Sequence, residues 1–148
     1  MARTELVYVT YIAASQQKVW EALLEPRFTQ QYWKHVNISD WKPGSRWEHR
    51  EGSASGKLKL VGEVIEFFPP RRLVMSWGEP ADAGNRAAQS RVSITLEPVG
   101  EMVRLIVHHD ELPGPDALRG VADGWARVVS SLKSLLETGR ALDTWEGH

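Results

Sequence analysis

The chain has 148 residues, of which 42% are hydrophobic and 25% are charged, a composition that is ordinary for a globular protein in water. Its formal net charge of -1 creates no overall field that would favour nucleic acid or an anionic membrane surface. The absence of cysteine excludes disulfide bonds and thiol catalysis, and seven tryptophans spread along the chain are the one unusual feature of the composition.

The N-terminal part of the chain predicts one strand followed by two short helices. Residues 5–12 are rich in β-branched and aromatic side chains, which is typical of a strand. Ser15 is suited to cap a short helix that places Val19, Ala22 and Leu23 on one face, and Pro26 ends that helix. A second short helix is expected over residues 26–33, with Pro26 at its start.

Short strands alternate with turn signals from residue 36 to residue 111, and this pattern indicates an antiparallel sheet. A type II turn is predicted at residues 42–45, where proline and glycine occupy the preferred central positions. The polar, glycine-containing segment 79–88 is predicted to be a mobile loop. The expected strands are residues 36–41, 46–51, 57–68, 72–77, 89–97 and 102–111, with a flexible connection at 52–56 and a break at 69–70.

A long amphipathic helix is predicted over residues 115–139, because apolar residues recur there at steps of three and four. Pro115 suits the first helical position, and Asp116 complements the positive end of the helix dipole. Gly139 can end the helix in a left-handed conformation. At about 1.5 Å per residue, such a helix is about 36 Å long and needs a partner surface of similar length.

Two glycines, Gly120 and Gly124, interrupt this helix, and each is expected to cost roughly 1 kcal/mol relative to alanine. With Ala117 and Ser131 they form an edge of small residues beside the apolar stripe. One interpretation is a close approach of the helix backbone to a strand, and the other is room for a ligand. We favour the close approach, since packing is a common reason for glycine inside a helix.

Together these elements predict an α+β fold. A curved antiparallel sheet of about seven strands wraps around the long C-terminal helix, and two short helices follow the first strand. We find no internal repeat, low-complexity tract or linker, so residues 1–148 are expected to form a single domain. A cavity between the sheet and the helix is a common consequence of this arrangement.

Four segments of the sequence, taken in order, carry a family resemblance. They are KVWEALLEPRFTQQYW at residues 18–33, GEVIEFFPPRRLVMSW at 62–77, VRLIVHH at 103–109 and GWARVVSSLKSLLETG at 124–139. They resemble the START-like (SRPBCC, helix-grip) superfamily, in particular the branch of homologues of the activator of the heat-shock-protein-ninety ATPase. The resemblance implies a helix-grip fold with an internal apolar pocket. It does not select one activity, because the superfamily contains lipid carriers, polyketide cyclases, hormone receptors and chaperone partners.

Signatures of catalysis and of metal binding are missing from the sequence. There is no GxSxG elbow, no glycine-rich phosphate loop and no HExxH motif. The neighbours His108 and His109 point to opposite faces of a strand, and no three potential ligands share a metal-binding spacing. We therefore expect neither a metal nor a cofactor.

Strand alternation predicts which side chains face the helix. On the last strand Arg104 marks the outer face, so that His109 points inward. We hypothesise a largely apolar pocket with two imidazoles near its mouth. Its expected ligand-binding residues are Trp47, His49, Met75, Trp77, His109 and Trp125. The alternative is that the tryptophans are core residues and that both histidines are solvated or satisfied by nearby backbone.

Three functions are compatible with this pocket. We favour binding of a small hydrophobic ligand (a lipid, an aromatic or a polyketide-like molecule) between sheet and helix, with residues 79–88 gating the opening. The second is an enzyme of the cyclase or hydrolase type that uses His49 or His109 as a general acid or base. The third is an interaction module that stimulates a chaperone ATPase, with the chaperone as its partner.

The expected location follows from the ends and the hydropathy of the chain. The first residues lack the basic head and the long apolar run of a signal peptide. No apolar run is long enough to span a bilayer. We therefore expect a cytoplasmic protein with no nucleic-acid partner.

Overall fold

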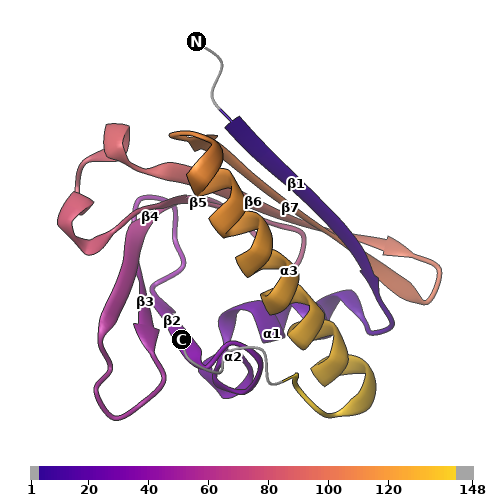
Figure 1. The fold of residues 1–148 in the computed structure, drawn as a ribbon. Coiled ribbons are helices and arrows are strands. Elements are labelled where there is room, and N and C mark those ends of the chain that lie inside the picture. The colour runs from indigo at the N-terminus through magenta and orange to yellow at the C-terminus, as the bar shows by residue number, and fades with distance from the viewer. Residues whose placement is uncertain (1–3, 143–148) are drawn as a thin grey trace.

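The computed structural model describes residues 4–142 and has the elements that the sequence predicts, in the predicted order. The helices are α1 (Gln16–Leu24), α2 (Pro26–Tyr32) and α3 (Pro115–Thr138), and two short 3-10 turns are η1 (Pro80–Asp82) and η2 (Arg86–Ala88). The strands are β1 (Thr4–Ile12), β2 (His35–Ser39), β3 (Arg46–Glu51), β4 (Leu58–Phe68), β5 (Arg72–Trp77), β6 (Ser90–Val99) and β7 (Met102–Leu112) (Figure 1).

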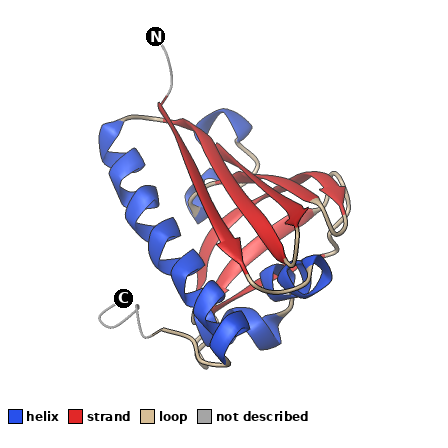
Figure 2. Cartoon of the chain, turned by 90° about the vertical axis from the view of Figure 1, so that its right-hand side faces the viewer, coloured by secondary structure: helices blue, strands red, loops and turns tan. Residues whose placement is uncertain are grey.

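The seven strands form one curved antiparallel sheet in the order β1-β7-β6-β5-β4-β3-β2. Helix α3 runs along one face of this sheet, and α1 and α2 lie near the C-terminal half of α3 (Figures 1 and 2). The side chains that face α3 are buried: Val103, Leu105, Val107 and His109 on β7 are each at most 1% exposed. The predicted α+β helix-grip class and the inward direction of His109 are therefore confirmed.

The ladder between β4 and β5 is interrupted at Gly62 and Glu63, between the pairs Val61–Gly78 and Val64–Met75. The indole Nε1 of Trp47 donates to the carbonyl oxygen of Ser76 at 2.7 Å, and the backbone N–H of Glu63 donates to Oγ of Ser76 at 2.8 Å. A Cβ atom on Gly62 would lie 1.9 Å from the Ser76 oxygen and 2.3 Å from the indole nitrogen. Only glycine fits here, because the backbone of β5 approaches so closely.

Helix α3 has the predicted ends. Pro115 is in its first turn, and Gly139 (φ 83°) caps it by donating its N–H to the Leu135 carbonyl at 2.9 Å. The buried residues of the helix are Trp125, Val128, Val129, Ser131, Leu132 and Leu135. Neither this helix nor any other within residues 4–142 is long and apolar enough to cross a membrane.

The two glycines of α3 do not have the packing role that we favoured. Within residues 4–142, no atom lies within 4 Å of a Cβ atom placed on Gly120 or on Gly124. The close-approach interpretation is therefore wrong, and the helix carries an open surface at both positions.

A few boundaries differ from the prediction for local reasons. Strand β2 ends at Ser39 rather than at Trp41, because Trp41 adopts a positive φ of 55° that leaves the strand conformation. Strand β6 continues through Pro98 to Val99, and the hairpin turn is made by Gly100 at φ 60°. The segment predicted as a mobile loop contains the turns η1 and η2.

Candidate ligand-binding site

The six residues predicted to bind a ligand come from β3, β5, β7 and α3, which converge on the helix side of the sheet. The ring of Trp77 is central among them. Its centroid lies 5.2 Å from that of Trp47, 5.6 Å from that of His109 and 5.4 Å from that of Trp125. These tilted and edge-on contacts are the geometries that aromatic rings prefer. The five predicted residues that carry rings, all except Met75, therefore form one aromatic cluster.

A chain of hydrogen bonds fixes the proton positions on His109. The indole Nε1–H of Trp125 donates to Nδ1 of His109 at 3.1 Å. Because an indole nitrogen only donates, Nδ1 carries no proton and the neutral ring has its proton on Nε2. This Nε2–H donates to Oγ of Ser90 at 2.7 Å, and the Ser90 hydroxyl donates to the carbonyl oxygen of Trp77 at 3.1 Å. Every donor in this chain has an acceptor.

His109 is a neutral structural group in this arrangement. It is fully buried, and burial lowers its pKa to about 4. A histidine that activates a serine must offer an unprotonated nitrogen to the hydroxyl. Here the nitrogen that faces Ser90 carries the proton, and the other nitrogen accepts from Trp125. The contact between Ser90 and His109 therefore gives no support to a hydrolase mechanism.

His49 is also neutral, but it lies in a different environment. The ring is 4% exposed, and its Nδ1 is 2.7 Å from Oδ1 of Asn37. It stacks on His35 with a centroid distance of 4.6 Å, and Trp33 lies at the same distance on a tilted plane. Burial, with smaller contributions from His35 and Lys59, lowers the pKa of His49 to about 3.

Two hollows lie near the aromatic cluster. The first is an enclosed cavity of about 20 Å³ between the sheet and the second half of α3, which is large enough for a single water molecule. The second is an open cleft of about 720 Å³ between the end of β7, the first turns of α3 and the segment 78–90. Of these two hollows, the open cleft has the volume of a typical small-molecule site and the enclosed cavity does not.

The predicted residues are divided between these hollows. Trp77 and His109 line the open cleft, whereas Met75 and Trp125 line the enclosed cavity. Trp47 and His49 line neither of them. The two imidazoles consequently do not share one opening. The hydrogen bond between Trp125 and His109 lies at the boundary between the cleft and the cavity.

Sequence analysis did not identify most of the cleft wall. Its further apolar residues include Leu60, Leu112, Pro113, Ala117, Gly120 and Val121, and its further polar residues are Glu79, Asp82, Gln89, Ser90 and Glu111. The spacing of Ala117 and Gly120 on one helix face was the available signal, because it marked a surface without bulky side chains. Residues 79–88 were expected to gate the opening, but no local pattern could indicate which of them line the wall opposite that helix face.

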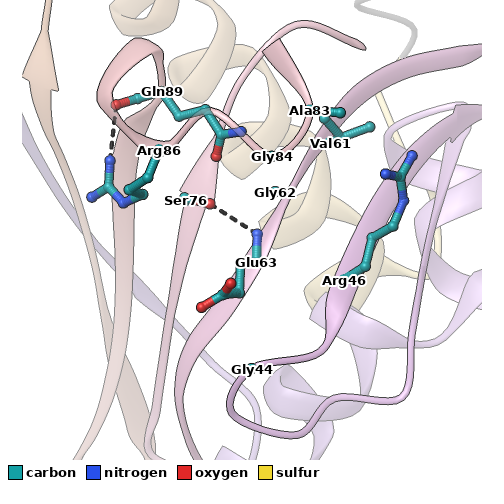
Figure 3. A pocket seen from close by; sticks show the side chains of 10 residues that line it. All are labelled: Gly44, Arg46, Val61, Gly62, Glu63, Ser76, Ala83, Gly84, Arg86 and Gln89. Carbon is teal, nitrogen blue, oxygen red and sulfur yellow. Dashed lines mark hydrogen bonds between the residues drawn. The ribbon is translucent and has the colours of Figure 1, made fainter. Parts of the chain in front are cut away.

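The segment between β5 and β6 borders the cleft and also a third hollow, which is smaller than the cleft and has a volume of about 220 Å³. In Figure 3 the side chains of Arg46 and Arg86 stand on opposite sides of this smaller hollow. Three hydrogen bonds hold the segment: Gln89 Nε2 donates to the Asp82 carbonyl at 2.8 Å, and Arg86 donates to the Gln89 carbonyl at 3.0 Å and to Glu111 at 3.1 Å. The Arg86–Glu111 pair ties the loop to β7.

One group of potential metal ligands exists within residues 4–142, and it lies away from the cleft. Glu5, His108 and Asp110 bring their ligand atoms within 4.8 Å of one another. His108 and Asp110 are on the face of β7 opposite to His109. Arg91 binds both carboxylate oxygens of Asp110, at 3.1 and 2.6 Å. Because the guanidinium group of Arg91 already pairs with the Asp110 carboxylate, we do not assign this group as a metal site.

Solved structures of other proteins share this fold. A protein from Cytophaga hutchinsonii matches with a TM-score of 0.76 and 26% identity, over 94% of this chain and 97% of that protein. CalU16 from Micromonospora echinospora matches with a TM-score of 0.73 and 20% identity, over 93% and 78%. An HSP90 activator from Plasmodium falciparum matches with a TM-score of 0.72 and 18% identity, over 89% and 95%.

The sequence comparisons agree with the fold. None of the curated proteins matches the chain at a significant level. Residues 13–137 match the family described as Activator of Hsp90 ATPase homolog 1-like protein, which confirms the resemblance found in the sequence. This match covers most of the chain, and the protein therefore belongs to the Activator of Hsp90 ATPase homolog 1-like family.

Proposed function

We propose that the protein binds a small hydrophobic molecule in the open cleft at the N-terminal half of α3. The observation that carries the proposal is the cleft itself, with a volume of about 720 Å³ and with Trp77 in its wall. Opposite β5, Ala117 and Gly120 of α3 leave room that larger side chains would fill.

The energetics favour the cleft over the enclosed cavity. A ligand that removes about 300 Å² of apolar surface from water gains about 7 kcal/mol before the cost of ordering it. The cleft has room for such a ligand, whereas a cavity of about 20 Å³ has not. The role of His109 in this proposal is to hold Trp77 and Trp125 in place through Ser90 and through Nδ1.

Two matched glycine variants test the position of the site. Gly120→Leu projects a side chain into the cleft, whereas Gly124→Leu adds the same side chain at an open position that does not line the cleft. Both replacements raise the helix propensity of α3. Ligands are first identified by native mass spectrometry of the purified protein and by thermal shift with lipids, aromatics and polyketides.

We expect Gly120→Leu to weaken binding of the identified ligand at least tenfold and Gly124→Leu to change it less than twofold, as measured by isothermal titration calorimetry. Equal effects of the two variants would place the ligand elsewhere. A protein that is purified empty and shows no thermal shift with any of these compounds would refute the proposal.

A second candidate function is supported by the family match. The family is named for an activator of the Hsp90 ATPase, and residues 13–137 match it. If this chain acts on such a chaperone, adding it in slight excess raises the rate of ATP hydrolysis by the chaperone from the same organism. An unchanged rate, together with no binding in a pull-down of the two purified proteins, would dismiss this candidate.

A further inference from the structure

We propose that the cleft selects amphipathic cations, namely an ammonium group on an apolar body, over fatty acids and other apolar anions. This inference rests on the proposed function and gives the chemical class of its ligand. Among the described residues 4–142, the charged residues that line the cleft are Glu79, Asp82 and Glu111, and none of the lining residues in this range is a lysine or arginine.

The carboxylates of the cleft are not equivalent. Glu111 is compensated by Arg86 at 3.1 Å and by Arg91 at 3.4 Å. Glu79 and Asp82 have no hydrogen bond or ion pair to a basic side chain within the described part of the chain, residues 4–142. Asp82 is a half-buried residue, and salt screens the charge of a partly buried group less than that of an exposed one. These two groups remain available to a ligand cation.

The other polar groups of the wall do not offset this negative charge. His109 is neutral and both of its ring nitrogens are bonded within the protein. Ser90 uses its hydroxyl proton on the Trp77 carbonyl. Gln89 spends an amide N–H on the Asp82 carbonyl at 2.8 Å. A carboxylate ligand would therefore meet two uncompensated negative charges and, among the lining residues within 4–142, no cation.

Apolar and aromatic surface lies beside the two carboxylates. The half-buried ring of Trp77, with Leu112 and Val121, lines the same cleft as Glu79 and Asp82. An ammonium group attracts carboxylates by charge and also interacts favourably with the face of an indole ring. Its alkyl or aryl body can cover the apolar wall at the same time.

Three ligands with the same ten-carbon tail test the selection at pH 7 and low salt: decyltrimethylammonium and decanoate below their micelle concentrations, and decanol below its solubility limit. We expect the cation to bind at least tenfold more tightly than decanoate, with decanol between them, in isothermal titration calorimetry. In the double variant Glu79→Gln, Asp82→Asn this ratio should fall below threefold. The matched control is Glu63→Gln, Glu101→Gln, which removes the same charge outside the cleft lining and should keep the ratio.

The outcomes separate the inference from the proposed function. If decanoate binds as well as the cation, the charge selection is refuted while the hydrophobic site stands. A ratio that falls equally in the control variant would assign the preference to the overall charge of the protein and would also refute the selection by the cleft. If none of the three ligands binds, both the inference and the proposed function fail.

Discussion

The indole nitrogen of Trp125 donates to Nδ1 of His109 across 3.1 Å, and this contact joins α3 to β7 between the cleft and the enclosed cavity. It is possible only while the imidazole is neutral, because a protonated Nδ1 would face another donor. The folded state therefore disfavours protonation of the His109 ring, which binds a proton more readily in an unfolded chain. The stability of the protein and the protonation of His109 must depend on each other.

Lowering the pH from about 6.5 to 5 should destabilise the protein. The folded pKa is about 4 for His109 and about 3 for His49, whereas a histidine in an unfolded chain titrates near 6.5. As the pH falls below about 6.5, the unfolded state therefore binds more protons than the folded state. The stability that is fully present above about pH 6.5 is lost progressively as the pH approaches the folded pKa values. The two rings together should cost about 3 kcal/mol of unfolding free energy over this range.

Urea unfolding at several pH values measures this loss. The variant His109→Gln should lose about half of the slope of stability against pH, because one of the two buried rings is gone. Stability that does not change between pH 6.5 and 5 would contradict the neutral, buried state of both histidines.

Replacement of Thr29 by valine should stabilise the protein by about 1 kcal/mol. Thr29 is fully buried on α2, and its Oγ1 is a buried side-chain atom without a hydrogen-bond partner within the described residues. Valine has nearly the same shape and removes the unpaired hydroxyl. Thermal unfolding checks the prediction, with Thr29→Ser as the control, since serine keeps the hydroxyl and loses the methyl group. A valine variant that is less stable than the original protein would contradict it.

Two glycine-to-alanine changes should have opposite effects on the free energy of unfolding. Gly62→Ala forces a Cβ atom against the Ser76 carbonyl and the Trp47 indole, and we expect a loss of about 2–3 kcal/mol. Gly124→Ala meets no atom within 4 Å and should gain about 1 kcal/mol from helix propensity. Chemical denaturation of both variants provides the test. A stabilised Gly62→Ala protein would show that β4 and β5 are not held as closely as described.

The variant Arg86→Gln should loosen the segment 79–89 without unfolding the sheet. It removes the ion pair to Glu111, and a partly exposed pair of this kind contributes at most about 1 kcal/mol. Hydrogen exchange of the amides in this segment should become several-fold faster, while exchange in β6 and β7 stays unchanged. Arg119→Gln is the control, because it removes an exposed ion pair to Asp116 on α3. Equal exchange in the two variants would mean that Arg86 does not hold the loop.

The features of the fold that depend on neighbouring residues were predictable. Pro115 and Gly139 marked the ends of α3, and alternation on β7 gave the direction of His109, because each of these signals acts within a few residues. The end of β2 at Ser39 was missed, since nothing near Trp41 in the sequence indicates its positive φ. Gly62 was also missed as a special position, because its need for glycine comes from the distant Ser76 and Trp47.

The candidate site was less predictable than the fold. Strand alternation placed Trp77 and His109 on the correct face of the sheet. It could not show whether the space in front of that face is an open cleft or is filled by side chains, because this depends on distances between elements that are far apart in sequence. The proton on Nε2 of His109 follows from Trp125 and Ser90 together, and no spacing rule links these residues. The close-approach interpretation of Gly120 was likewise ruled out only by the space around it.

The burial of α3 is uneven, and this has a consequence for larger ligands. All of its buried side chains lie from Trp125 onward, and none lies in residues 115–124. The early turns can therefore tilt outward while losing few core contacts, with the later turns acting as the anchor. If the cleft binds a ligand as proposed, such a tilt would admit a molecule bulkier than the cleft as it stands, and the largest ligand accepted would depend on how firmly Trp125 is held.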